Sequence, residues 1–354
     1  MAEQLLEMEQ YMQRCLQLAQ KAQGMTYPNP MVGCVIVHQG RIIGEGYHVK
    51  AGTPHAEVNA IHSVKDHDLL KESTLYVNLE PCAHYGRTPP CSLLIIEKQI
   101  PRVVIGCVDS FSEVAGKGIE MMKAKGIEVL VGVCESEARE LNRRFFTFHE
   151  KRRPYIILKW AQSADGFLDA IRGVDVKPVW LTNEWARKYV HKQRSEEMAI
   201  LIGTNTALLD NPSLTVRQWH GAQPLRVVID RDLKLPPNLT LFTDGKPTLV
   251  VNANKTETQG NTSYAKVDFS VDFEGELLDL LHQHGIQSLI VEGGRVTLSS
   301  FIDKGLWDEA FVYEGRVELH NGIPAPRLNQ NSKEIITLND SRLSIYRNRA
   351  EGQG

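Results

Sequence analysis

The sequence predicts an α/β protein with two domains, residues 1–150 and 151–354. Strand-like apolar runs alternate with helical patterns along most of the chain, which is typical of sheets covered by helices. At 354 residues the chain is too long for one average domain. The segment Arg152-Arg153-Pro154 interrupts the alternation, so we place the domain boundary near residue 150.

The first half begins with a helical pattern that ends near Gly24 and continues into a hairpin through Gln39-Gly40. After the hairpin, helices and strands alternate, which implies a partly parallel sheet with helices on both faces. The predicted elements are helix 8–23, strands 34–37 and 41–48, helix 55–64, strand 74–79, helix 91–98, strand 102–107, helix 116–125, strand 127–131 and helix 135–147.

The second half reads as another α/β unit. Thr182-Asn183-Glu184 is a helix-capping sequence. The predicted elements are strand 155–160, helix 184–194, strands 199–203, 225–230 and 247–252, helix 275–283, strand 287–291 and helix 296–304. No Gly-x-Gly-x-x-Gly follows a strand, so a Rossmann domain is not expected. Val291-Glu292-Gly293-Gly294 could instead present a helix N-terminus to a phosphate, or could be a purely steric turn.

Composition narrows the class of protein. A net charge of −3 provides no bulk attraction to nucleic acid or to an anionic membrane, so neither is an expected partner. The first twelve residues lack the basic and apolar regions of a signal peptide, and no apolar run has spanning length. Six cysteines in so long a chain do not resemble a disulfide framework. We therefore expect a cytoplasmic protein.

Residues 55–91 contain the most informative pattern. His55, Cys82 and Cys91 offer one imidazole and two thiols, the ligands that zinc prefers, and a catalytic zinc keeps three protein ligands and one position for water. Glu57 lies two residues from the histidine and would remain unligated beside that water. His-x-Glu followed by Pro-Cys and a second Cys is the pattern of zinc-dependent nucleobase deaminases.

Two other interpretations remain open at this point. His-x-Glu is common on surface helices, and two cysteines are often inert core residues. A structural zinc is the stronger alternative, with His84 as a fourth protein ligand. The cysteines follow the strand-like run at 74–79, and loops at strand ends are where α/β proteins place their sites, which favours the catalytic interpretation.

Four stretches resemble one family in particular. They are Tyr-Pro-Asn-Pro-Met-Val-Gly-Cys at 27–34, Gly-Tyr-His at 46–48, Pro-His-Ala-Glu-Val at 54–58, and Leu-Glu-Pro-Cys-Ala-His-Tyr-Gly-Arg-Thr-Pro-Pro-Cys at 79–91. Together they resemble the bifunctional pyrimidine deaminase/reductase family of bacterial riboflavin biosynthesis, whose two cysteines have this long spacing. The resemblance implies a cytidine-deaminase-like α/β/α fold for the first domain.

The same resemblance implies roles for residues of the first domain. It makes His55, Cys82 and Cys91 the zinc ligands and Glu57 the proton shuttle. The deaminase substrate pocket would be lined by Asn29, His48, His84, Arg87 and Asp109. Where the family commonly has Asp-Pro-Asn-Pro, this chain has Asp-Ser-Phe-Ser at 109–112, so only the contact of Asp109 is carried over.

The second half is similar to the reductase part of that family, which has a dihydrofolate-reductase-like fold. The similarity rests on Leu-Lys-Trp-Ala-Gln-Ser-Ala-Asp-Gly at 158–166, the loop 204–217 and Val-Glu-Gly-Gly at 291–294. The implied NADPH contacts are Ala161, Trp180, Thr206, Asp210, Arg231, Gly294, Arg295, Val296, Thr297, Leu298, Ser299 and Ser300. The implied substrate contacts are Arg194, Leu214, Arg217 and Glu292.

The predicted function is therefore a bifunctional enzyme of riboflavin biosynthesis. Zinc would serve deamination of a phosphorylated diaminopyrimidine, and NADPH would serve reduction of its ribosyl group to ribityl. The family also suggests a homo-oligomer. The rival hypotheses are a zinc deaminase of cytosine, guanine or tRNA adenine, and a non-catalytic protein with a structural zinc. The number of protein ligands on the metal distinguishes catalysis from structure.

Overall fold

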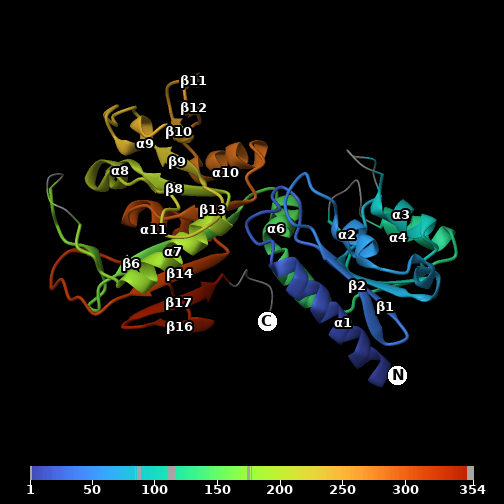
Figure 1. Cartoon of the computed structure of the whole chain (residues 1–354). Helices are drawn as coiled ribbons and strands as arrows, with labels where there is room; N and C mark the ends of the chain where they lie inside the picture. Colours follow the sequence, from blue (N-terminus) through green and yellow to red (C-terminus); the bar gives the residue numbers. More distant parts are fainter. Residues whose placement is uncertain are drawn as a thin grey trace. The chain divides into compact units, whose positions relative to one another are not determined.

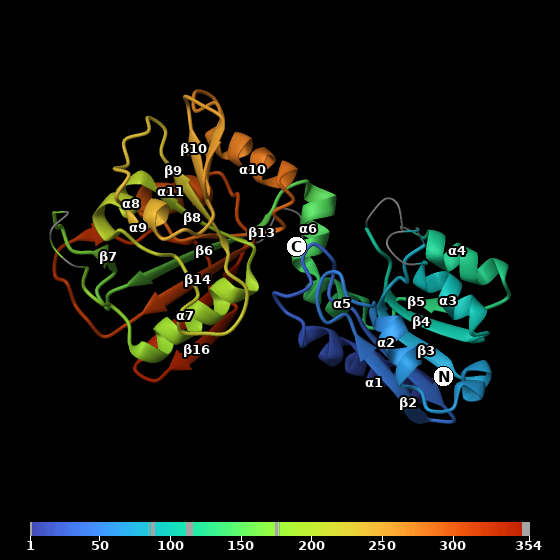
Figure 2. The ribbon, with the colours of Figure 1, turned by 45° about the horizontal axis from the view of Figure 1, so that its top comes forward.

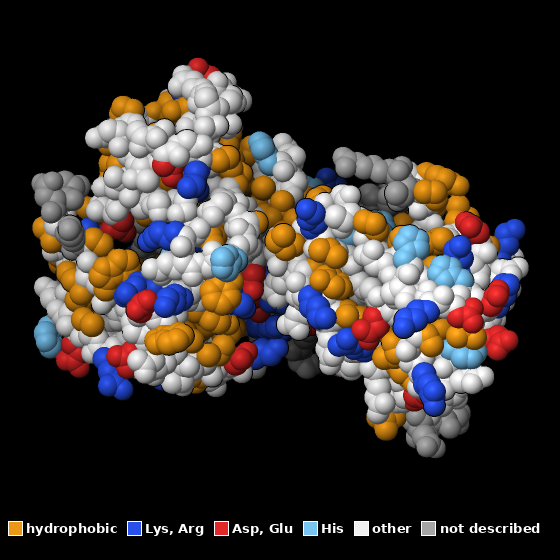
Figure 3. All heavy atoms as spheres, viewed as in Figure 1, with side chains coloured by type: hydrophobic (Ala, Val, Ile, Leu, Met, Phe, Trp, Pro, Cys, Tyr) orange, Lys and Arg blue, Asp and Glu red, His pale blue; other side chains and the backbone are white. Residues whose placement is uncertain are grey.

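The computed structural model describes residues 2–83, 85, 89–110, 116–173, 176 and 178–348. The chain divides into two compact units, Met1–Lys151 and Arg152–Gly354, and each has its own sheet and buried core (Figure 1). Among the described helices, none combines the length and hydropathy of a membrane span. Acidic and basic side chains are interspersed on the face of each unit that Figure 3 shows.

The first unit contains a five-stranded sheet in the order β2-β1-β3-β4-β5. β1 pairs antiparallel with β2 and β3, whereas β3, β4 and β5 run parallel. This is the partly parallel sheet that the sequence predicts. The strands are β1 (Gly33–His38), β2 (Arg41–Tyr47), β3 (Thr74–Leu79), β4 (Arg102–Cys107) and β5 (Glu128–Val131).

Helices cover both faces of this sheet, which confirms the expected α/β/α arrangement (Figure 2). The helices are α1 (Ala2–Gln20), α2 (Ala56–Ser63), the 3₁₀ helix η1 (His67–Glu72), α3 (Cys91–Glu97), α4 (Lys117–Ala124), α5 (Glu135–Leu141) and α6 (Arg143–Lys151). Alternate residues of β1 face opposite layers, because Val35 packs with α1 whereas Ile36 packs with α2, α3 and α4.

The helix α2 lies unusually close to β2. A Cβ atom on Gly46 would be 2.3 Å from the backbone N of Ala60, and one on Gly44 would be 2.6 Å from the Ala60 carbonyl oxygen. Only glycine fits at such distances, so these two positions fix how deeply α2 is seated. The N-terminus of α2, which carries the His-x-Glu motif, is held against the sheet as a result.

Two predicted helices have different bounds in the structure. α1 begins at Ala2 rather than at residue 8. The sequence pattern did not predict these first turns because they lack a buried apolar stripe: even Leu5 and Leu6 are exposed. The predicted helix 135–147 is two helices, α5 and α6, separated at Asn142. The Asn142 side chain is buried and bonds the backbone of Met31, at 2.8 Å through Oδ1 and 2.9 Å through Nδ2.

The second unit contains a ten-stranded sheet in the order β11-β12-β10-β9-β8-β13-β6-β14-β17-β16. Strands β6, β8, β9, β10, β12, β13 and β14 run parallel, and β11 and β17 are antiparallel to their neighbours β12 and β14. The strands are β6 (Tyr155–Gln162), β7 (Phe167–Asp169), β8 (Ala199–Gly203), β9 (Leu225–Ile229), β10 (Thr248–Asn252), β11 (Glu257–Gln259), β12 (Thr262–Lys266), β13 (Ser288–Val291), β14 (Glu309–Glu314), β15 (Ile323–Pro324), β16 (Glu334–Leu338) and β17 (Ser341–Arg347).

Helices also lie on both faces of this second sheet. One face packs against α10 and α11, while the other packs against α8, α9 and α7 along different parts of its width. The helices are α7 (Glu184–Glu196), α8 (Thr204–Asp210), α9 (Thr240–Thr243), α10 (Phe273–Gln283) and α11 (Arg295–Asp303). The sequence did not predict the short strands β7 and β15, which form a separate two-stranded sheet.

Candidate active sites

The predicted zinc ligands come from three separate segments of the first unit. His55 directly precedes α2, Cys82 follows β3, and Cys91 is the first residue of α3. Their ligand atoms all lie within 4.8 Å of one another. His55 Nδ1 is 3.3 Å from Cys91 Sγ and 3.6 Å from Cys82 Sγ. The fold therefore brings together the three side chains that the motif selects.

These distances fit a tetrahedral zinc site. Zinc–sulfur bonds of ~2.3 Å and zinc–nitrogen bonds of ~2.0–2.1 Å place nitrogen and sulfur about 3.6 Å apart along a tetrahedral edge. Cys82 also accepts a hydrogen bond of 3.3 Å from the backbone N–H of Cys91. Hydrogen bonding from the Cys91 side chain lowers the pKa of the Cys82 thiol to about 4, which favours the thiolate that binds metal.

Glu57 is the second residue of α2 and is almost fully buried, at 3% exposure. Burial raises the pKa of its carboxyl to about 6. A divalent cation at the adjacent site would act in the opposite direction, because it favours the ionised form. A carboxyl group with a pKa near neutrality can both accept and donate a proton at physiological pH.

Asn29 and His48 form a hydrogen-bonded row beside the predicted ligand His55. Asn29 Nδ2 is 3.1 Å from His48 Nε2, and His48 Nδ1 is 3.2 Å from the carbonyl oxygen of Pro54. Because the amide donates and the carbonyl accepts, this network requires neutral His48 with its hydrogen on Nδ1. Burial lowers the pKa of His48, which favours the neutral ring. Its ring centre is 5.4 Å from that of His55.

Two buried asparagines hold the segment that carries Asn29. Besides Asn142, the strand residue Asn78 accepts from Gly33 N at 2.7 Å and donates to Met31 O at 3.1 Å. Sequence reasoning did not select either residue. An amide within the apolar run at 74–79 is the one feature of the sequence that could have identified Asn78.

The other predicted residues of this pocket are placed less completely. Asp109 lies just beyond β4 and is buried, and its backbone N–H donates to Glu80 Oε2 at 3.4 Å. His84 and Arg87 lie outside the described residues. Among the described residues, His55, Cys82 and Cys91 form a group that could hold a metal ion; the structural-zinc alternative, which adds His84, concerns a residue outside that part of the chain.

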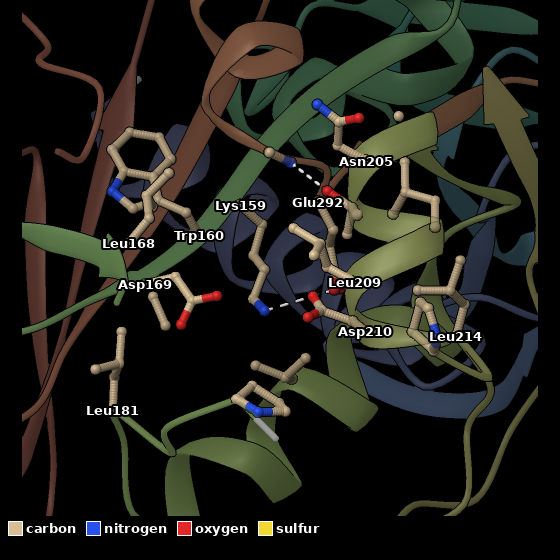
Figure 4. A pocket seen from close by; sticks show the side chains of 18 of the residues that line it. Lys159, Trp160, Leu168, Asp169, Leu181, Asn205, Leu209, Asp210, Leu214 and Glu292 are labelled. Carbon is tan, nitrogen blue, oxygen red and sulfur yellow. Dashed lines mark hydrogen bonds and ion pairs between the residues drawn. The ribbon is translucent and has the colours of Figure 1, made fainter. Parts of the chain in front are cut away.

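The second unit contains a cavity of about 1250 Å³. It lies at the carboxyl ends of β6, β8 and β13, the edge at which open parallel sheets bind ligands. Lys159 points into it from the second half of β6 and Glu292 from just after β13, and Asp169 and Asp210 line it from β7 and α8 (Figure 4). The cavity volume lies above the range of ~300–1,000 Å³ that is usual for small-molecule pockets.

A group of paired charges occupies the floor of this cavity. Arg194 donates to Glu292 through Nε at 3.0 Å and Nη2 at 2.7 Å, and Lys159 Nζ is 3.6 Å from Glu292 Oε2. Burial acts to raise the pKa of Glu292, but Arg194 and Lys159 outweigh it and lower that pKa to about 2. Burial lowers the pKa of Lys159. Sequence reasoning missed Lys159, although it lies within a quoted motif.

Arg217 is placed differently from Arg194. Its guanidinium donates to the Ser213 hydroxyl at 2.9 Å, and its backbone N–H lies 3.4 Å from His191 Nδ1. Burial lowers the pKa of His191 to about 4, together with the charges of Arg194 and Arg217. Arg194 therefore has a carboxylate partner within the protein, whereas the partner of the Arg217 side chain is a neutral hydroxyl.

Comparisons with known proteins agree with this geometry. Residues 6–107 match the cytidine and deoxycytidylate deaminase zinc-binding region, and residues 154–315 match the RibD C-terminal domain. The riboflavin biosynthesis protein RibD of Aquifex aeolicus is 44% identical over 309 residues, which cover 86% of this chain and 85% of that protein. The chain belongs to the RibD family.

Solved RibD structures share the fold over nearly the whole chain. A RibD from Acinetobacter baumannii has a TM-score of 0.87 at 32% identity and covers 98% of this chain and 100% of its own. The deaminase/reductase from Thermotoga maritima has the same TM-score and coverage at 35% identity. As a RibD protein, this chain is a bifunctional deaminase and reductase of riboflavin biosynthesis.

Most of the predicted NADPH contacts lie around the RibD reductase cavity. It is lined by Ala161, Trp180, Thr206, Asp210, Gly294, Arg295, Val296, Thr297 and Leu298, and by the predicted substrate residues Arg194, Leu214, Arg217 and Glu292. Three predicted contacts are absent from this lining. Arg231 is largely exposed beside Asp232, while Ser299 and Ser300 follow the lining residues along α11.

Steric crowding explains why glycine is required in the turn after β13. A Cβ on Gly293 would lie 2.6 Å from the backbone N of Gly203, so the ends of β8 and β13 approach too closely for a side chain. Gly294 N donates to Thr206 Oγ1 at 2.9 Å. Behind them, α11 directs its N-terminus toward the cavity, an arrangement suited to phosphate groups.

Proposed function

We propose that the first unit deaminates a diaminohydroxyphosphoribosylaminopyrimidine with His55, Cys82 and Cys91 as its zinc ligands. The convergence of these three side chains beside buried Glu57 is the observation that carries the proposal. The similar protein from Thermotoga maritima is a deaminase of this pyrimidine, which supports the choice of substrate. A coupled assay with this pyrimidine and NADPH tests it: ammonia release should precede NADPH oxidation, and ammonia release should not require NADPH.

In the deaminase site, Glu57 does the proton transfers. Bound zinc would supply a water activated at neutral pH. Glu57 takes one proton from that water as its oxygen bonds to the ring carbon, and passes the proton to a ring nitrogen. Glu57 then takes the second proton from the hydroxyl group now on that carbon and gives it to the amino group, so that a carbonyl forms as the carbon–nitrogen bond breaks and ammonia leaves. Asn29 and His48 orient the pyrimidine in this proposal, which their hydrogen-bonded row beside His55 supports.

Zinc content gives the most direct test of the ligand set. The purified protein should contain about one zinc per chain, and Cys82→Ser should lose most of it, because a neutral hydroxyl replaces a thiolate ligand. Elemental analysis after dialysis measures this. Cys107→Ser is the matched control, since this last residue of β4 is buried and lies outside the cluster. Stoichiometric zinc in the Cys82 variant would exclude Cys82 as a ligand.

For the second unit, we propose reduction of 5-amino-6-(5-phosphoribosylamino)uracil with NADPH bound in the cavity. The cofactor supplies a hydride when bound. As the ribosyl ring opens, its ring oxygen needs a proton, and Lys159 is the buried acid directed into the cavity. Its pKa is lowered by burial, so it gives up a proton more readily than an exposed lysine. Glu292 holds the amine in position, and Arg194 holds Glu292.

Arg217 is the proposed contact for the substrate phosphate. Arg217→Ala should raise the reductase KM roughly tenfold to a hundredfold, since a charge-assisted hydrogen bond is worth about 1.5–3 kcal/mol. NADPH affinity should change little, and deamination not at all. Steady-state kinetics of both half-reactions and NADPH titration measure these effects. A collapse of NADPH affinity with an unchanged KM would instead assign Arg217 to the cofactor.

A further inference from the structure

Glu80 is a buried carboxylate, and its hydrogen-bond donors in the part of the chain that the structure describes belong to one loop and the helix after it. Its Oε2 accepts from Gly116 N at 2.9 Å and from Asp109 N at 3.4 Å. Its Oε1 accepts from Gly118 N at 3.0 Å and from Ile119 N at 3.3 Å. The residue is only 4% exposed. One side chain thus satisfies four backbone N–H groups, including those of the first turn of α4.

These contacts link both ends of the β4–α4 loop to the chain segment that carries a zinc ligand. Asp109 starts the loop and Gly116 ends it, and the same oxygen of Glu80 accepts from both. Glu80 follows β3 directly and precedes Cys82 by two residues. α4 also touches this segment, because a Cβ on Gly118 would lie 2.3 Å from the Pro81 carbonyl oxygen.

Cys82 itself is fixed from the opposite side. Its carbonyl oxygen accepts from the backbone N–H of Ser92 at 3.2 Å and from the Ser92 hydroxyl at 3.0 Å. The segment 80–82 is therefore clamped between α4, through Glu80, and α3, through Ser92. A displacement of Glu80 would therefore move Cys82, which is two residues further along the chain, and Asp109, whose backbone N–H is hydrogen-bonded to Glu80.

We propose that Glu80 is a positioning residue that holds zinc ligand Cys82 and substrate-loop residue Asp109 in one common geometry. A carboxylate is needed because all four partners are donors. A glutamine of the same shape would turn an N–H₂ group toward N–H groups, and two of the four would lose their acceptor. Both parts of the proposal rest on the function proposed above, in which Cys82 is a zinc ligand and Asp109 contacts the substrate.

The test compares Glu80→Gln with Glu97→Gln in the full-length, zinc-loaded protein. Glu97 ends α3, which begins with Cys91, and its side chain is 73% exposed, so it is a matched control. We expect Glu80→Gln to release zinc to a chromophoric chelator roughly tenfold faster and to raise the deaminase KM roughly tenfold. The reductase rate of the same sample should be unchanged. Glu97→Gln should match the wild type throughout.

Zinc release and KM both unchanged in Glu80→Gln would overturn the proposal, even if the melting temperature falls. If this variant does not fold, Glu80→Asp decides: it keeps the charge but shortens the reach, so wild-type values of both quantities would equally overturn it. Asp109→Asn separates the two claims. If that variant has a normal KM, the assigned role of Asp109 is wrong, whereas faster zinc release in Glu80→Gln would still support the link to Cys82.

Discussion

Replacing Glu57 by glutamine should abolish ammonia release while zinc remains bound. The substitution removes the proton shuttle and no metal ligand. General acid–base groups contribute ~10²–10⁴-fold to rate, and two proton transfers depend on this one carboxyl, so a loss at or above the upper end is expected. Because burial already raises the pKa of Glu57 to about 6, a neutral amide of the same shape should be accommodated without unfolding.

Three measurements on this variant check the result. Ammonia release gives the deaminase rate, elemental analysis gives the zinc content, and NADPH oxidation with the already deaminated substrate gives the reductase rate. The last two should equal those of the wild type. Glu120→Gln, at an exposed position of α4, is the control for the same substitution in the same unit. Near-normal ammonia release from Glu57→Gln would remove Glu57 from the mechanism.

Replacing Lys159 by methionine should have the largest effect on the reductase. The hydride transfer would lack its proton donor, so the rate should fall by ~10²–10⁴-fold. Glu292 keeps its bidentate partner Arg194, and the cavity should therefore retain its shape. NADPH titration should show nearly unchanged affinity, and ammonia release should be unaffected. Lys188→Met, which changes an exposed lysine of α7 paired with Glu184, is the matched control.

The pH dependence provides a second readout for Lys159. The group acts as an acid, so only its protonated form is competent. The reductase rate should then fall as pH rises through the pKa of Lys159, which burial holds below the ordinary value for lysine. The residual activity of Lys159→Met should lack this alkaline limb. The same limb in both proteins would show that another group donates the proton.

The sequence was most informative where a site is built from short motifs. The predicted ligands of the first unit lie at the ends of regular elements, and their residue types together with the family resemblance predicted that His55, Cys82 and Cys91 converge. The alternation of strand and helix patterns also predicted that helices cover both faces of the sheet. Asn142 shows the limit of such patterns, because the bond that breaks its helix goes to Met31, a residue far away in the chain.

The reductase cavity was less predictable because it, too, depends on contacts between residues that are far apart in the chain. Its charges are set by pairs between distant segments, such as Lys159 of β6 with Glu292 after β13. A motif shows that Arg194 is present but not that a carboxylate neutralises it. The C-terminal residues had no recognisable motif, yet β14, β17 and β16 complete one side of the ten-stranded sheet.

The position of β13 has a consequence for how the protein is made. β6 is the first strand of the second unit to leave the ribosome, but its two neighbours in the sheet, β13 and β14, are among the later strands of the chain. Until Ser288 has been synthesised, both edges of the apolar strand β6 are unpaired, whereas β8, β9 and β10 can already pair with one another. Unpaired apolar strands invite aggregation. Folding of the second unit therefore depends on prompt synthesis of its last third. A chain truncated before residue 288 would contain the whole deaminase unit, but its second sheet would lack β13 and could not be completed.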